Sequence, residues 1–162
     1  MHDFLLTFGH WLQTRSFALA IAQSDWVFPF VQATHFVGLS LWVGTNVALD
    51  LSLLGVGNKH QVPARLSAAL FVWNWVGFAI AITGGFLLFS SSASMYVTNV
   101  AFLTKLCVLI PLALVLHIFN QRKVQEWGLN PDPPSAAKLA GAMELLLWLC
   151  VVTAAVSIPY AA

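Results

Sequence analysis

The sequence predicts an all-α membrane protein, an up-down bundle of four transmembrane helices preceded by an amphipathic helix at the membrane surface. Four apolar stretches, at residues 27–54, 68–89, 100–119 and 137–158, carry this prediction. Each can cross about 30 Å of hydrocarbon at about 1.5 Å per residue. Only 8% of the 162 residues are charged, whereas a soluble domain has about 25%. We therefore expect one membrane domain over residues 1–162, surrounded mainly by the lipid bilayer.

Residues 1–23 are expected to form an interfacial helix. Large apolar side chains recur there at helical spacing: Phe4, Leu5, Phe8, Trp11 and Leu12. Asp3 and Arg15 lie off that face. This pattern is typical of a helix lying in the plane of the membrane surface. It also fits a helix packed on the end of the bundle.

Turn-forming residues separate the spans. Ser24 and Asp25 offer N-cap chemistry before the first span, and Pro29 stands in its first turn, where a missing amide is tolerated. Pro159 closes the fourth span. The three connections are expected at residues 55–63, 90–99 and 121–135.

Basic residues predict the orientation of the chain. One end of the spans carries five of them: Lys59, Arg65, Arg122, Lys123 and Lys138. The other end has only Arg15 outside the spans. By the positive-inside rule, both termini face away from the cytoplasm. The net charge of +1 argues against nucleic acid as a partner.

Polar residues within the spans are the candidates for function, because each is costly in lipid. At about 100° per residue, one face of the first span gathers Gln32, His35, Gly38, Trp42, Asn46 and Asp50. This face should point into the bundle. The second span carries a ridge of small residues, Gly77, Ala81, Gly84 and Gly85. Such a ridge allows close helix packing, or leaves room for a flat ligand.

A b-type haem is one interpretation of these features. His35 would be the axial metal ligand, with His10 or no second protein ligand. Gly38, Gly84 and Gly85 would make room for the ring, and Lys105 would pair with a propionate or simply reach the interface. His117 lies about nine residues deeper than His35, roughly 13 Å, so the two cannot hold one iron. An interhelical hydrogen bond is the alternative role for His35.

A second group of polar residues lies nearer the inner ends of the spans. His117, Glu144 and Asp50 are expected at similar depths. A buried carboxyl group needs a proton or a partner, and His117 is the expected partner of Glu144. Asp50 would join the pair directly or through water. These contacts could carry protons or only hold the helices together.

The first span also resembles a known family. Residues 33–39 (ATHFVGL), Gly44 and residues 49–55 (LDLSLLG) are similar to a pattern of histidine, glycine, glycine and LDLRLLG in small uncharacterised four-helix bacterial inner-membrane proteins. Ser52 stands where that family has arginine. The match continues at Thr83, Gly84, Phe89, Lys105 and His117. The resemblance implies a four-helix fold in the bacterial inner membrane.

Three functions fit the sequence. The first is a membrane protein that binds b-type haem and carries electrons to a membrane partner. The alternative is a non-catalytic accessory subunit packed against other membrane subunits, or a homo-oligomer. The third is a proton path through Asp50, His117 and Glu144, which would need an oligomer to enclose it. The chain has no nucleotide-binding loop, HExxH motif or hydrolase triad, so we do not expect an enzyme on its own.

Overall fold

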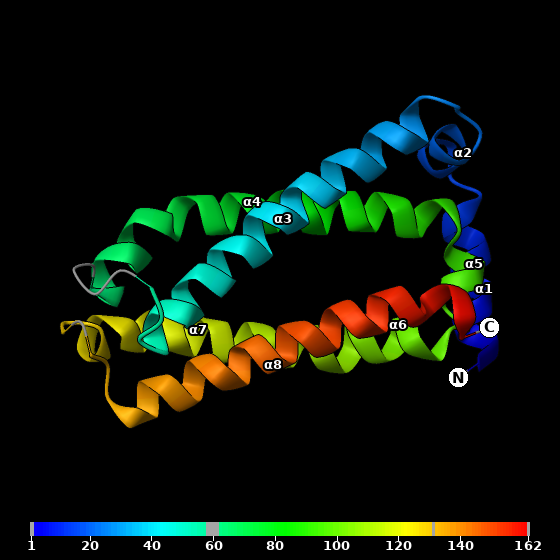
Figure 1. The fold of residues 1–162 in the computed structure, drawn as a ribbon. Helices are drawn as coiled ribbons and strands as arrows, with labels where there is room; N and C mark the ends of the chain where they lie inside the picture. Colours follow the sequence, from blue (N-terminus) through cyan, green and yellow to red (C-terminus); the bar gives the residue numbers. More distant parts are fainter. Residues whose placement is uncertain (1, 58–61, 131, 162) are drawn as a thin grey trace.

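The computed structural model describes residues 2–57, 62–130 and 132–161. Within these residues, four helical segments are long and apolar enough to cross a membrane, at Val27–Leu53, Pro63–Ser91, Val100–Trp127 and Ser135–Tyr160. Consecutive segments run in opposite directions along one long axis, and both chain termini lie at the same end (Figure 1). The protein is thus a multi-pass helical membrane protein by the length and composition of its helices.

The second and third helical segments extend beyond the apolar stretches of the sequence, whereas the first matches its stretch to within one residue. Helix α3 covers Val27–Leu53, and α4 covers Pro63–Ser91, where residues 68–89 were expected. Pro63 is tolerated in the first turn of α4 because its missing N–H would have no helical partner. Helix α7 (Ile110–Trp127) continues past residue 119 through a polar stretch, and Gly128 is its C-cap. Hydropathy marks where a helix leaves lipid, whereas the helix itself continues as long as its buried face finds contacts.

The third segment contains a widened turn. Helix α6 (Val100–Thr104) passes into a π-helical turn, η1 (Lys105–Leu109), before α7 begins. The Ile110 N–H donates to the Lys105 carbonyl, five residues earlier, whereas an α-helical N–H donates to the carbonyl four residues earlier. Pro111 has no N–H, and its ring crowds the carbonyl four residues earlier. The π turn is therefore the local response to Pro111. Helix α8 (Ser135–Ser157) and the short 3₁₀ turn η2 (Ile158–Tyr160) complete the chain.

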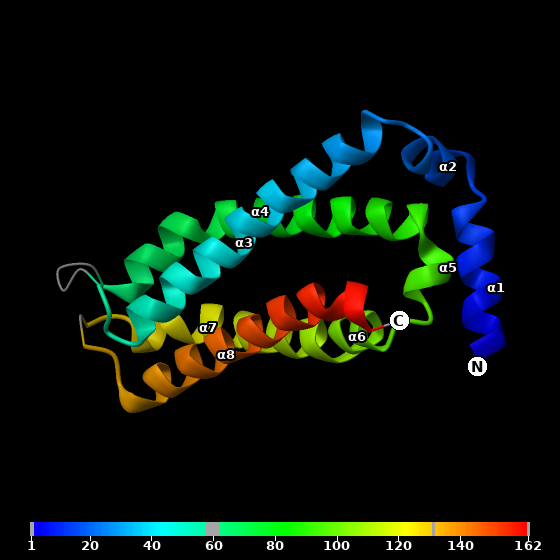
Figure 2. The same ribbon diagram turned by 45° about the vertical axis from the view of Figure 1, so that its right-hand side comes forward.

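The N-terminal region differs from the expected helix over residues 1–23. It forms two helices, α1 (His2–Gln13) and α2 (Ser16–Ala22), separated by extended backbone at Arg15. Helix α1 lies across the end of the bundle beside α5 (Ala93–Tyr96) (Figures 1 and 2). Gly9 permits the approach, because a Cβ there would lie 3.0 Å from Ser94 Cα.

The large apolar side chains expected to share one face of the N-terminal helix do not share one environment. Leu12 is buried against the bundle, whereas Phe4, Phe8 and Trp11 are exposed. The Gln13 side-chain oxygen accepts hydrogen bonds from the Ser94 amide at 3.2 Å and the Ser94 hydroxyl at 2.7 Å. Helix α1 is therefore attached to the bundle through Leu12, Gln13 and the close approach at Gly9, while its aromatic side chains face outwards.

Helices α3 and α4 make the tightest contact in the fold. An added Cβ at Gly38 would lie 2.6 Å from the Ala81 amide nitrogen, and one at Gly77 would lie 2.6 Å from the Trp42 amide nitrogen. The two backbones can approach this closely only because both positions lack side chains. Past this crossing, the N-terminal half of α3 diverges from α6 and α8 (Figures 1 and 2).

The orientation in the membrane stays a prediction. In a chain whose native Cys107 and Cys150 are replaced by alanine, Gln125→Cys should react with a membrane-impermeant maleimide only from the cytoplasmic side. Thr98→Cys should react only from the opposite side. Both side chains are exposed, at opposite ends of the bundle. The reverse labelling pattern in sealed right-side-out vesicles would show that the positive-inside bias has been misread. Lys59, one of the five basic residues, lies outside the described residues.

Candidate functional site

Six polar side chains meet inside the bundle, and we call them the polar core: Asn46, Asp50, Asn74, His117, Asn120 and Glu144. They come from α3, α4, α7 and α8. None is more than 3% exposed, and Asp50, Asn120 and Glu144 are completely buried. Polar side chains at this depth cost free energy unless they are hydrogen-bonded. Their partners therefore decide what the polar core can do.

Glu144 is the centre of the polar core. Its Oε1 lies 2.6 Å from His117 Nδ1. Its Oε2 accepts a hydrogen bond from Asn120 Nδ2 at 2.6 Å, and the Trp148 indole N–H donates to Oε1 at 3.3 Å. Helix periodicity explains the arrangement, because Asn120 is one turn after His117 on α7 and Trp148 is one turn after Glu144 on α8.

Asn74 fixes the protonation of one His117 nitrogen. The Asn74 side-chain nitrogen donates to Asn46 Oδ1 and, at 2.8 Å, to the Thr45 hydroxyl oxygen. Its oxygen therefore faces His117 Nε2, 3.1 Å away. An amide oxygen only accepts, so Nε2 carries a hydrogen. One further proton is then shared between His117 Nδ1 and Glu144.

Asp50 completes the group of titratable side chains. Its carboxyl group neighbours that of Glu144. As a carboxylate it has no hydrogen-bond donor among the described residues, whereas as a carboxylic acid it can donate to the Glu144 carboxyl group. Gly141 brings α8 close to this turn of α3, because a Cβ there would lie 3.0 Å from the Asp50 carbonyl oxygen. Two carboxyl groups and one imidazole thus meet in a space that is shielded from bulk solvent.

Apolar layers close the polar core on both sides. The layer nearer the termini consists of Trp42, Ala81, Ala113 and Trp148. The layer nearer the opposite end consists of Leu49, Leu53, Val124 and Ala137, with Trp127 against it. In the first layer, the rings of Trp42 and Trp148 meet edge to face with centroids 4.7 Å apart. A single chain is therefore enough to enclose the polar core.

Some of these contacts were anticipated from sequence and others were not. Glu144 was expected near His117, with Asp50 close by, and the structure brings the three together. Asn74 and Asn120 were missed, although an asparagine inside a transmembrane helix is itself a signal of an internal contact. Gln32 was expected to face the interior, but it is exposed. The reason is the divergence of α3, which takes its first turns away from the bundle.

His35 lies at a separate position, against α4. Its Nδ1 donates to the Ala81 carbonyl at 2.7 Å, and the ring is half-buried. A Cβ at Gly84 would lie 2.8 Å from His35 Cβ, and one at Gly85 would lie 3.1 Å from the ring. The glycines expected to admit a haem are therefore covered by α3 and by His35 itself. We conclude that the residues present do not fit a haem at this position.

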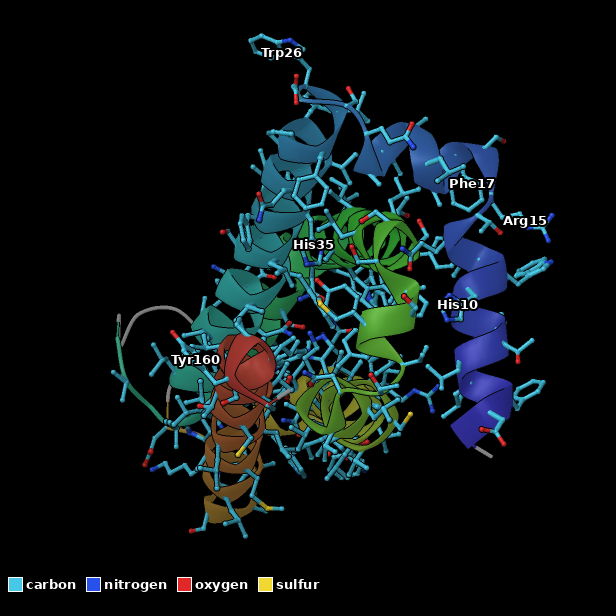
Figure 3. All side chains as sticks on the ribbon, turned by 90° about the vertical axis from the view of Figure 1, so that its right-hand side faces the viewer. His10, Arg15, Phe17, Trp26, His35 and Tyr160 are labelled. Atoms are coloured by element: carbon cyan, nitrogen blue, oxygen red, sulfur yellow. The ribbon has the colours of Figure 1, made fainter. Side chains whose placement is uncertain are left out.

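The other expected cofactor residues are not assembled around His35. Gly38 is covered by α4. Lys105 begins the π turn, and its ammonium lies 5.4 Å from the centre of the Phe102 ring. His10 is exposed on α1, away from His35 on α3 (Figure 3). No group of three His, Cys, Asp or Glu side chains in the described part of the chain is arranged to hold a metal ion. That result covers the polar core as well as His35.

Comparisons of the chain with models of protein families, with curated protein sequences and with solved structures found no match. Its function must therefore be inferred from the polar core itself.

Proposed function

We propose that this membrane protein takes up and releases protons at Asp50, His117 and Glu144, and that it acts in proton-coupled transport across the membrane. The observation that carries the proposal is the direct contact of titratable side chains from three different transmembrane segments, each no more than 1% exposed. Intramembrane ionisable residues that face one another are typical of proton relays.

The chemistry of the three groups supports exchange of a proton. The contact between His117 and Glu144 holds one proton in either of two positions, as imidazolium with carboxylate or as imidazole with carboxylic acid. Glu144 also accepts hydrogen bonds from Asn120 and Trp148, which hold both of its oxygens in place. The neighbouring Asp50 carboxyl group then needs a proton, because two adjacent carboxylates and one imidazolium would leave a net charge in an apolar interior.

The apolar layers support transport more than a purely structural role. A proton held between two closed layers is separated from both membrane faces, which is the occluded state that transport requires. A structural link between helices would need only one hydrogen-bonded pair. No comparable observation favours haem-based electron transfer or an accessory subunit, because the exposed aromatic side chains are equally suited to lipid.

Infrared spectroscopy of the protein in lipid nanodiscs would test proton binding. A pH titration should reveal carboxylic acid C=O bands that decrease as the pH rises and that persist in the Glu126→Gln control, since Glu126 is exposed. Asp50→Asn and Glu144→Gln should each remove or shift such a band. Identical titrations for wild type and both variants would show that the buried carboxyl groups do not exchange protons.

A flux assay would test transport itself. In liposomes with an internal pH dye and an imposed potassium diffusion potential, wild-type protein should carry protons faster than empty liposomes do. Glu144→Gln should reduce the flux, and Glu126→Gln should not. An absorption spectrum of the purified protein provides a further check, because a haem band lost in His35→Ala would contradict the packing argument above.

A further inference from the structure

We infer that the bundle holds a file of bound water molecules along the inner face of α3, running from Asp50 to Trp42 and extending the polar core into the apolar layer nearer the termini. The buried side-chain atoms without a partner in the described residues lie in this one region: Trp42 Nε1, Asn46 Nδ2, Asn120 Oδ1 and the Asp50 carboxyl oxygens, of which one can bond Glu144 when Asp50 is protonated. Such a concentration calls for a ligand, since buried polar groups are normally satisfied.

The spacing of these atoms fits a file. Trp42, Asn46 and Asp50 follow one another every four residues, so they stand in a row on one face of α3, about 6 Å apart along its axis. The two ends of the row contact α8, whereas Asn46 in the middle accepts a hydrogen bond from Asn74 on α4. Trp42 lies against Trp148, and Asp50 lies against Gly141. Two hydrogen bonds through one water span about the same distance as each step of the row.

The types of atom identify the ligand as water. Trp42 Nε1 and Asn46 Nδ2 are donors, whereas the Asn120 and Asp50 oxygens are acceptors. A bare cation would satisfy only the acceptors, and an anion only the donors. Water does both, and a buried water needs about two to four polar partners. Asn120 and Asp50 both neighbour Glu144, so the acceptors of the file lie around the centre of the polar core.

The file makes the two sides of the polar core different, because it reaches only one of the two apolar layers. Trp42 belongs to the apolar layer on the side of the termini. Its unpartnered N–H is therefore a polar site for water within that layer. The opposite layer, around Leu49, Leu53 and Val124, has no unpartnered buried side-chain atom among the residues described. Proton exchange would therefore take place towards the terminal side. This role of the water rests on the proposed function, whereas the hydration itself does not.

Hydroxyl-radical labelling by X-ray radiolysis tests the file in wild-type protein, because bound water produces radicals next to the side chains it contacts. Trp42 and Phe102 are both aromatic and both buried, at 5% and 9% exposure, and Phe102 lies outside the polar core. With each labelling rate divided by its rate in the unfolded chain, Trp42 should react several-fold faster than Phe102. Equal protection of the two side chains would overturn the inference.

Two substitutions of Asp50 test whether the labelling of Trp42 depends on the polar side chains of the row. Asp50→Leu should lower the labelling of Trp42, because it removes the polar group at one end of the file, whereas Asp50→Asn should retain it. An unchanged rate in a folded Asp50→Leu protein would count against the file. Strong labelling of Trp42 combined with no proton titration in the infrared experiment would leave the water site standing and reject the proposed function.

Discussion

Replacing Glu144 with leucine is expected to lower the free energy of unfolding by about 3 kcal/mol or more, because it leaves three buried groups without their partner. His117, Asn120 and Trp148 all bond to this one carboxyl group. A leucine of similar size cannot bond any of them. Glu144→Gln should cost only about 1 kcal/mol, since the amide can still accept from Asn120 and donate to His117.

Thermal or denaturant unfolding in detergent micelles would measure the difference between these two variants. Lys138→Gln is a suitable control. Lys138 bonds Asp132 at 2.7 Å outside the core, and this lysine lowers the pKa of the exposed Asp132 carboxyl group. An exposed pair of this kind contributes little, so this variant should unfold like the wild type. A leucine variant as stable as the glutamine variant would show that the polar core does not hold the bundle together.

Substituting Gly77 with valine is expected to separate α3 from α4. The added Cβ would lie 2.6 Å from the Trp42 amide nitrogen and 3.1 Å from the Gly38 carbonyl oxygen. Backbone atoms cannot move aside without shifting the whole helix, so the cost should reach about 3 kcal/mol, the upper part of the range for overpacking. Because Trp42, Thr45 and Asn46 lie on this stretch of α3, the contacts of Asn74 should be disturbed as well.

Gly44→Val is the matched control, since nothing lies within 4 Å of a Cβ at Gly44. Both glycines are inside transmembrane helices and both substitutions add the same β-branched side chain, so any difference between them reports on the α3–α4 contact. The measurement is the same unfolding experiment, supplemented by the labelling rate of Trp42. Equal stability of the two variants would contradict the tight contact.

The small-residue ridge illustrates what sequence could and could not resolve. The spacing of Gly77, Ala81 and Gly85 indicated a flat face on the second span, but close packing and a flat ligand both remained open. The choice depends on which helix lies against the ridge, and helical periodicity carries no information about that. The packing of Gly38 and His35 on it favours the first meaning and removes the space that the haem interpretation needed.

The sequence by itself determined the four spans and the presence of costly polar groups inside them. Both follow from local properties, since span length and side-chain polarity are set by the bilayer acting on each segment separately. It also indicated the meeting of His117 with Glu144, because depth along two helices can be counted. Only the tertiary structure decided that Asn74, Asn120 and Trp148 join them and that Gln32 does not. Those contacts depend on the rotation and crossing of whole helices, which are fixed by backbone approach at a few glycines.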